Sequence, residues 1–168
     1  MRKILILLSM LVLFSACGTA RLTPEQKREQ AARTAQLVNQ RLDARTYRIS
    51  VDYMYPLRGR GRAVTDNYSL TVDGNKVSSH LPYFGAAYSV PYGGGKALVF
   101  DDEIKDYSED TSRADRRRIQ FSTDNGEDFI VYTVTVFDNG EADIHVNCRN
   151  RDDIRYRGTL YPEDFPKE

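Results

Sequence analysis

The chain has 168 residues, 40% of them hydrophobic and 29% charged, and its 24 basic and 24 acidic side chains cancel. This length suffices for one domain with a substantial core but is short for two ordinary domains. The balanced charge gives no electrostatic reason to expect nucleic-acid binding. Eleven Tyr and seven Phe, without any Trp, favour a fold rich in β-structure.

The first residues have the pattern of a bacterial lipoprotein signal. Two cations precede an apolar run over residues 4–14 that is too short to cross a bilayer. Small Ser and Ala then precede Cys17, whose thiol could carry diacylglycerol after cleavage. We expect residues 1–16 to be a signal peptide, residues 17–22 a lipidated tether, and residues 23–168 one β-rich domain with an N-terminal helix.

Processing at Cys17 would also decide the charge and the cysteine chemistry of the mature chain. Losing the two cations of the signal lowers the basic count from 24 to 22, against 24 acidic side chains. Acylation of Cys17 would leave Cys148 without a partner for an intramolecular disulfide. The fold must then be held together by burial of its apolar side chains.

The domain is predicted to begin with an amphipathic helix over residues 24–42. Thr23 can cap it, Pro24 suits its first turn, and Gln26 can complete a capping box. A narrow apolar stripe recurs at helical spacing, formed by Ala31, Ala35, Val38 and Leu42. Small alanines offer little area for insertion into lipid, so packing on the domain is favoured over a membrane-surface role.

The remaining chain alternates with a period of two, which predicts short strands joined by turns. Strands are expected at residues 47–56, 68–72, 96–100, 119–121, 129–137, 142–148 and 154–160, with Val77 on a further strand that returns from the turn after residue 72. Asp73-Gly74-Asn75 and Asp138-Asn139-Gly140 are hairpin signals, whereas Arg58–Arg62 is interpreted as a flexible basic connection. Eight or nine strands favour an antiparallel meander, preferably an eight-stranded lipocalin-like barrel because closure removes sheet edges. The alternative is a two-sheet sandwich.

The segment 79–95 has an unusual composition, with four aromatic residues, two prolines and four glycines. The rings of Tyr83, Phe84, Tyr88 and Tyr92 could form a platform for a sugar, a peptide or a lipid. The alternative is that they plug one end of the barrel. Its triple glycine has neither the P-loop tail nor the dinucleotide-binding spacing.

Catalytic groups do not assemble from the sequence. The histidines are His80 and His145; Ser79 lies beside the first, but neighbours in a strand point to opposite faces. By the same parity His145 and Cys148 lie on opposite faces, and Cys148 is expected to be a buried structural thiol. No catalytic residue and no cofactor is therefore assigned.

The acidic stretch over residues 101–110 could offer oxygen ligands to Ca²⁺, but it lacks EF-hand spacing and a turn glycine. We interpret it as a solvated acidic loop and assign no metal site. The four arginines that follow it are expected to balance this charge, with a polyanion site as the alternative. They are Arg113, Arg116, Arg117 and Arg118.

Several motifs resemble those of the DUF4251 family of Bacteroidetes lipoproteins. They are the lipobox at Cys17 and residues 41–45, 67–72, 81–85, 91–93 and 154–158. The resemblance implies a lipocalin-like β-rich fold and supplies neither an activity nor catalytic residues. Surface lipoproteins of that phylum often carry acidic residues after the cysteine, and residues 18–22 lack them. The resemblance thus favours an outer-membrane address facing the periplasm.

The sequence as a whole predicts a membrane-anchored periplasmic lipoprotein that acts as a non-catalytic binding or envelope-structural module. The alternative is a cell-envelope hydrolase whose active site the spacing does not reveal. The expected partners are the membrane, through the lipid anchor, and a small ligand, glycan or peptide, but not nucleic acid.

Overall fold

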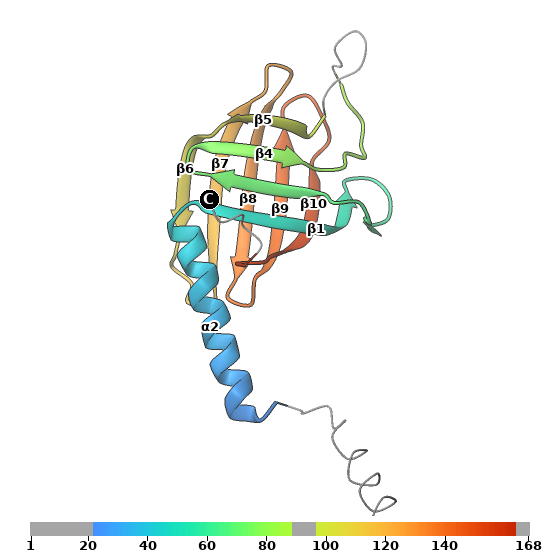
Figure 1. The fold of residues 1–168 in the computed structure, drawn as a ribbon. Helices are drawn as coiled ribbons and strands as arrows, with labels where there is room; N and C mark the ends of the chain where they lie inside the picture. Colours follow the sequence, from blue (N-terminus) through green and yellow to red (C-terminus); the bar gives the residue numbers. More distant parts are fainter. Residues whose placement is uncertain (1–21, 89–96, 164–168) are drawn as a thin grey trace, which may run out of the picture. The chain divides into compact units, whose positions relative to one another are not determined.

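The computed structural model describes residues 22–88 and 97–163, and Figure 1 shows its ribbon. By compactness the chain divides into two units, Met1–Gln30 and Ala31–Glu168. Helix α2 (Pro24–Asp43) runs from the first unit into the second, and every strand belongs to the second. No helix in the described ranges is long and apolar enough to span a membrane.

Helix α2 begins with the predicted capping box. The amide of Gln26 donates to Thr23 Oγ1 at 3.2 Å, and the amide of Thr23 donates to Gln26 Oε1 at 2.9 Å. The predicted stripe is only half right, because Val38 and Leu42 are buried whereas Ala35 is partly buried and Ala31 is exposed. A methyl group adds little apolar area, so the larger side chains of the last two turns account for the buried contact.

Ten strands follow the helix, and all their pairings are antiparallel. They are β1 (Thr46–Pro56), β2 (Arg62–Ala63), β3 (Ser69–Asp73), β4 (Lys76–His80), β5 (Val99–Glu103), β6 (Lys105–Asp110), β7 (Arg116–Asp124), β8 (Phe129–Phe137), β9 (Glu141–Cys148) and β10 (Ile154–Leu160). Nine of them form one path in the order β5-β4-β3-β1-β10-β9-β8-β7-β6, and β2 pairs with β1 off this path.

This sheet curls into a nearly closed barrel, as predicted, but with nine strands on its path rather than eight. In Figure 1, strands β1, β3, β4 and β5 cross steeply over strands β7 to β10. Along the chain, a single residue, the buried Ile104, separates β5 from β6 at the two ends of the path. The Thr123 hydroxyl on β7 donates to the Asp102 carboxylate on β5, which links the two sides of the seam.

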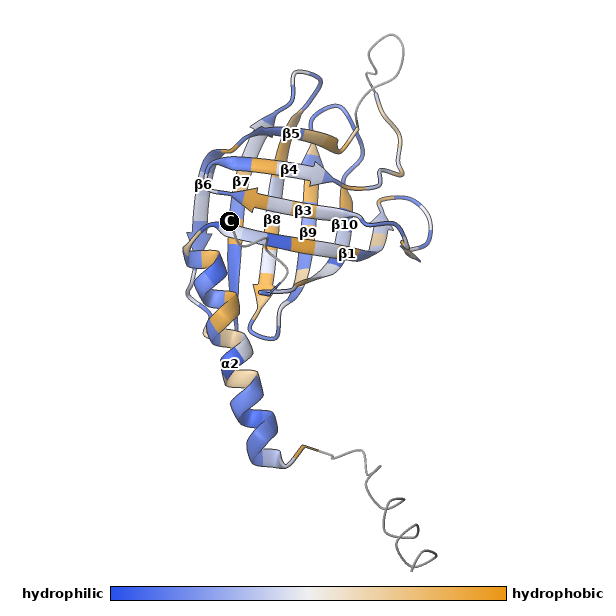
Figure 2. Cartoon of the chain, viewed as in Figure 1, coloured by the Kyte–Doolittle hydropathy of each residue, from blue (hydrophilic) through white to orange (hydrophobic). Residues whose placement is uncertain are grey.

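The core lies inside this barrel and follows the strand period. Along β8 the buried side chains alternate with partly buried ones, and Ile130, Tyr132, Val134 and Val136 face inward. Figure 2 shows the same alternation of apolar and polar positions along the strands. Fully buried Tyr132 stacks on Phe121, with ring centroids 4.9 Å apart. Large side chains therefore fill interior positions of the barrel.

Both predicted hairpins are confirmed. Asp73 pairs with Lys76 across a two-residue turn, in which Gly74 has a φ of 57° that suits glycine. Gly140, with a φ of 87°, follows β8 and its amide donates to Phe137 O at 2.9 Å. These turns set the register of the β3–β4 and β8–β9 pairs.

Two segments interpreted as loops contain strands instead. Strand β2 begins at Arg62, the last residue of the basic connection, and pairs with Tyr53 and Met54 of β1. The acidic stretch forms most of β5 and all of β6. In β6, Tyr107 is partly buried and the other five residues are exposed. An edge strand pairs through its backbone on one side, so β6 needs no apolar alternation to form against β7.

Candidate functional site

The segment Leu81–Tyr88 is held against the β9–β10 connection by backbone bonds. Buried Leu81 donates its amide to Leu98 O at 3.1 Å. The Asp152 amide donates to Ala86 O at 3.0 Å, and the Tyr88 amide donates to Asn150 O at 2.8 Å. The path of this segment is therefore fixed by the barrel rather than by its own turns.

Tyr83 anchors this segment through its side-chain hydroxyl. Its ring is partly buried, and its hydroxyl donates to Ala86 O at 2.8 Å and lies 3.2 Å from Asp152 O. Burial, with the nearby Cys148 and Asp152, raises the pKa of Tyr83 to about 12. The hydroxyl thus lies against two backbone carbonyl oxygens, so Tyr83 anchors the segment, and its role as a ligand contact stays a prediction.

Phe84 and Tyr88 instead leave their rings in solvent, at 56% and 66% exposure. The Arg62 guanidinium carbon lies 3.7 Å from the centroid of the Phe84 ring and covers one face of it. The Tyr88 hydroxyl donates to the Asp152 carboxylate. This bond, and a second from the Ala86 amide, lower the pKa of Asp152. Each ring is thus positioned by a neighbour while part of it remains available.

More apolar side chains reach solvent in the chain segment that leads to Arg62, whose guanidinium covers Phe84. Tyr55, at the end of β1, is 40% exposed, and Leu57 in the next turn is 59% exposed. The Tyr55 ring lies 4.8 Å from that of Tyr53, and both rings lie against Gly61. We call this surface the aromatic end. It comprises Tyr53, Tyr55, Leu57, Phe84 and Tyr88.

A buried ionic cluster supports the aromatic end. Arg151, whose side chain is only 5% exposed, lies 3.5 Å from Asp128 Oδ2 and 3.3 Å from Glu127 Oε2. Asp128 Oδ1 accepts the amides of Arg149 and Asn150, each at 3.0 Å. These bonds fix the connection to which Leu81–Tyr88 is attached. Sequence reasoning missed the cluster, because its members come from separate turns.

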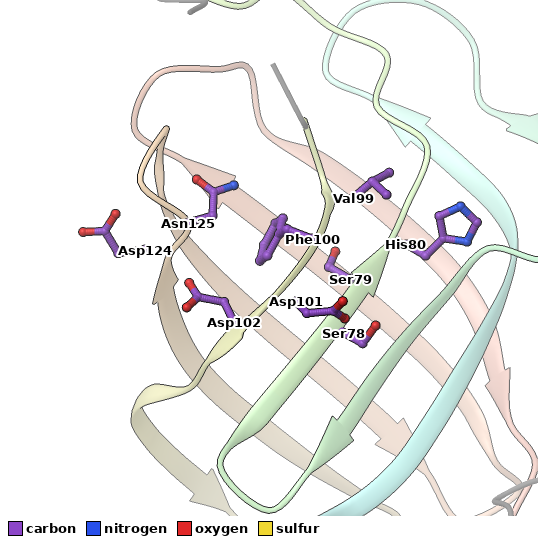
Figure 3. Close-up of a pocket in the computed structure, with 9 residues that line it drawn as sticks. All are labelled: Ser78, Ser79, His80, Val99, Phe100, Asp101, Asp102, Asp124 and Asn125. Atoms are coloured by element: carbon purple, nitrogen blue, oxygen red, sulfur yellow. The ribbon is translucent and has the colours of Figure 1, made fainter. Parts of the chain in front are cut away.

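A hollow of about 660 Å³ lies at the seam between β5 and the β7–β8 turn. Figure 3 shows Phe100 and Asp102 on the side of β5 that faces Asp124 and Asn125, with His80 on the other side. Buried Ser79 also borders it, but its hydroxyl donates to Leu98 O at 2.8 Å and accepts from Tyr132 at 3.0 Å. The Ser79 hydroxyl is therefore engaged by a backbone carbonyl and a tyrosine, not by a basic side chain.

The other catalytic candidates remain apart as the parity argument predicted. Cys148 is buried and unpaired, and burial raises the pKa of its thiol to about 12. His145 is partly exposed on the opposite face, with Nε2 3.3 Å from Asp153 Oδ2. His80 is exposed and Ser79 is buried, so these neighbours do point to opposite sides. Among the described residues, no group of three or more His, Cys, Asp or Glu could hold a metal ion.

Part of the basic segment does balance the acidic one. Arg117 pairs with Asp43 and lies 3.6 Å from Glu109 Oε2. Bonds from Ser112, assisted by Arg118 and Arg113, lower the pKa of Asp110. Two predicted site residues, Cys17 and Tyr92, lie outside the described residues.

Comparison with known proteins agrees with the motifs. A crystal structure of a DUF4251 family protein from Bacteroides eggerthii DSM 20697 has the same fold, with a TM-score of 0.59. It is 17% identical in sequence, and the match covers 78% of this chain and 89% of that one. No curated protein matches this chain significantly. The family model described as "Domain of unknown function (DUF4251)" matches residues 25–160, and the chain therefore belongs to the DUF4251 family.

Proposed function

We propose that this protein is a membrane-anchored, non-catalytic binding module of the cell envelope and that the aromatic end binds a polypeptide partner. The observation that carries the proposal is the exposure of Phe84 and Tyr88 on a backbone that is bonded to the barrel. A contiguous exposed apolar patch marks an interaction site more often than scattered apolar residues do. Because the backbone is already ordered, binding would cost little conformational entropy.

The composition of the aromatic end favours a polypeptide over the other ligand classes. Tyrosine, phenylalanine and arginine are enriched at protein interfaces, and Arg58 and Arg62 lie beside the exposed rings. Leu57 adds an aliphatic side chain that a sugar would not use well. Aromatic rings that are held in position beside guanidinium groups are typical of the few interface residues that carry most of the binding energy.

This proposal is tested by photo-cross-linking in the native host. With a photoreactive residue at Tyr88, we expect a covalent adduct with a polypeptide. Leu57→Ala with Phe84→Ala should reduce that adduct by about tenfold or more, because hot-spot side chains carry most of the affinity. The thermal midpoint should move by only about 2 °C, because exposed side chains contribute little to stability.

The matched control replaces two exposed apolar residues outside the aromatic end. Val99 and Tyr161 are 47% and 51% exposed, and Val99→Ala with Tyr161→Ala should leave the adduct unchanged. The aromatic end would be refuted as the binding surface if both double variants lost the same amount of adduct, or if neither variant reduced it.

The membrane anchor in this proposal rests on the signal sequence that ends at Cys17. The proposed location is the outer membrane, with the protein domain facing the periplasm. Labelled palmitate should be incorporated by the wild-type chain and not by Cys17→Ala. A Cys17→Ala protein that remains fully in the membrane fraction would show that lipid is not the anchor.

A further inference from the structure

The register of the sheet aligns a row of charged and hydroxyl side chains across the outer face of the barrel. Arg118 on β7 pairs with Thr135 on β8, and Thr135 pairs with Asp143 on β9. Asp143 then pairs with Arg157 on β10. Arg118, Asp143 and Arg157 are exposed, and Thr135 is partly buried. Two arginines, three strands apart, thus lie at the two ends of one row.

A second row runs beside the first. Thr133 on β8 pairs with His145 on β9, and His145 pairs with Arg155 on β10. Arg155 pairs with Tyr55 on β1, which ends the row with a ring that is 40% exposed. Tyr55 is also the point at which this surface meets the aromatic end.

The two rows line one hollow of about 630 Å³. Three arginines and one aspartate border it, so its fixed charge is positive, whereas the signal-free chain has more acidic than basic side chains. A second hollow shares Arg118 and Thr135 with the first and adds Arg113, Arg116 and Asp110. Arg116 Nε lies 3.7 Å from Asp115 Oδ1. The cations therefore form a continuous face rather than isolated surface charges.

The acidic residues on this face are fewer than its arginines, because Asp110, Asp115, Asp143 and Asp153 stand against five arginines. Asp143 engages one arginine, with 3.3 Å between Arg157 Nε and Asp143 Oδ1. Within the described part of the chain, Arg155 forms no ion pair and is exposed. A free guanidinium presents a planar set of donors that matches a carboxylate, and it is available here for an external anion.

We propose that this face, comprising Arg118, Thr133, Thr135, His145, Arg155 and Arg157, binds an acidic glycan. The arginines would bind the carboxylates of the sugar chain, and the threonine hydroxyls would bond its hydroxyl groups. The Tyr55 ring at the edge offers a surface on which a sugar ring can stack. The face adjoins the aromatic end at Tyr55, but none of its six residues belongs to the aromatic end, and the proposal does not depend on a polypeptide partner there.

The geometry of the sheet determines the length of glycan that fits. Neighbouring strands lie about 4.8 Å apart, so the three steps from β7 to β10 separate Arg118 from Arg157 by roughly 14 Å at the backbone. This span exceeds one sugar ring. The face therefore suits an oligosaccharide that carries carboxylates on separate residues, rather than a monosaccharide.

The test uses the full chain, purified in detergent, and titration calorimetry with oligogalacturonate at about 0.1 M salt. Wild-type protein should bind this probe and should bind neutral galactan and polyglutamate at least about tenfold more weakly. The variant Arg118→Gln, Arg155→Gln, Arg157→Gln should lose about tenfold or more in affinity for oligogalacturonate. Its thermal midpoint is measured alongside, to confirm that it is folded.

A matched triple variant removes the same charge elsewhere. Arg28, Arg33 and Arg48 are exposed and lie outside the hollow, and replacing them with Gln should leave affinity within about twofold. The proposal fails if this control loses as much affinity, if polyglutamate binds as tightly as oligogalacturonate, or if wild-type protein does not bind. Leu57→Ala with Phe84→Ala should bind the glycan normally, which separates this proposal from the polypeptide site.

Discussion

Replacing Gly158 by alanine should destabilise the barrel by at least ~3 kcal/mol, the largest effect that we expect from a single methyl group. A Cβ at this position would lie 2.1 Å from Ser50 O and 3.1 Å from Val51 Cα on the neighbouring strand. Both contacts are with backbone, so no side chain can rotate away from them. Strands β1 and β10 would have to separate where Gly158 pairs with Val51. Urea denaturation measures the loss.

The control for this prediction is a glycine with open space around it. Gly74 has a φ of 57°, and no atom lies within 4 Å of the position that a Cβ would take there. Asparagine tolerates this conformation, so Gly74→Asn should cost only about 1 kcal/mol or less. If Gly158→Ala unfolds at the same urea concentration as wild type, strands β1 and β10 do not pack this closely.

Replacing Arg151 by methionine should cost about 3 kcal/mol of stability. The substitution keeps most of the volume and removes the cation, which leaves the fully buried carboxylate of Asp128 with backbone amides but no charged partner. For a domain of this size, that loss corresponds to a fall in thermal midpoint of roughly 10 °C. Differential scanning calorimetry provides the measurement.

Arg149→Met is the matched control, because Arg149 is exposed, its guanidinium carbon lies 5.2 Å from the centroid of the Phe129 ring, and it forms no ion pair within residues 22–88 and 97–163. We expect its cost to stay within about 0.5–1 kcal/mol. Equal midpoints for Arg151→Met and Arg149→Met would mean that the buried cluster does not hold the β9–β10 connection.

Much of the fold could be predicted because burial and strand period coincide along the chain. Residues 129–137 form a continuous run of mostly β-branched and aromatic residues, and β8 has these same bounds with every second side chain buried. Gly74 and Gly140 marked the hairpins, since positive φ selects glycine. The parity argument also placed His145 and Cys148 on opposite faces.

The edge strand β6 could not be predicted from its sequence. It is built on backbone pairing with β7 and buries almost no side chain, so it leaves no apolar alternation. The exposure of Ala31 was missed for a related reason, because a helical period shows which face is apolar but not how far the partner surface extends.

The candidate site could be predicted as a segment but not residue by residue. Tyr83 and Phe84 look equivalent in the sequence, yet one anchors the backbone and the other reaches solvent. Their difference depends on Asp152, which is 69 residues away from Tyr83 along the chain. The arginine face is likewise created by strand order, which joins Arg118 to Arg157 across β8 and β9. Such tertiary neighbours leave no local signal.

Residues 81–88 form an ordered platform that is bonded to the barrel, and the rings of Phe84 and Tyr88 are exposed on it. Amide hydrogen exchange, followed by NMR, tests this order directly. The amides of Leu81, Ala86 and Tyr88 donate to Leu98 O, Asp152 Oδ2 and Asn150 O, and we expect their exchange to be at least about a hundredfold slower than in an unstructured peptide. Exchange of all three amides at the unstructured rate would contradict the account, because the exposed rings would then have no fixed surface from which to bind.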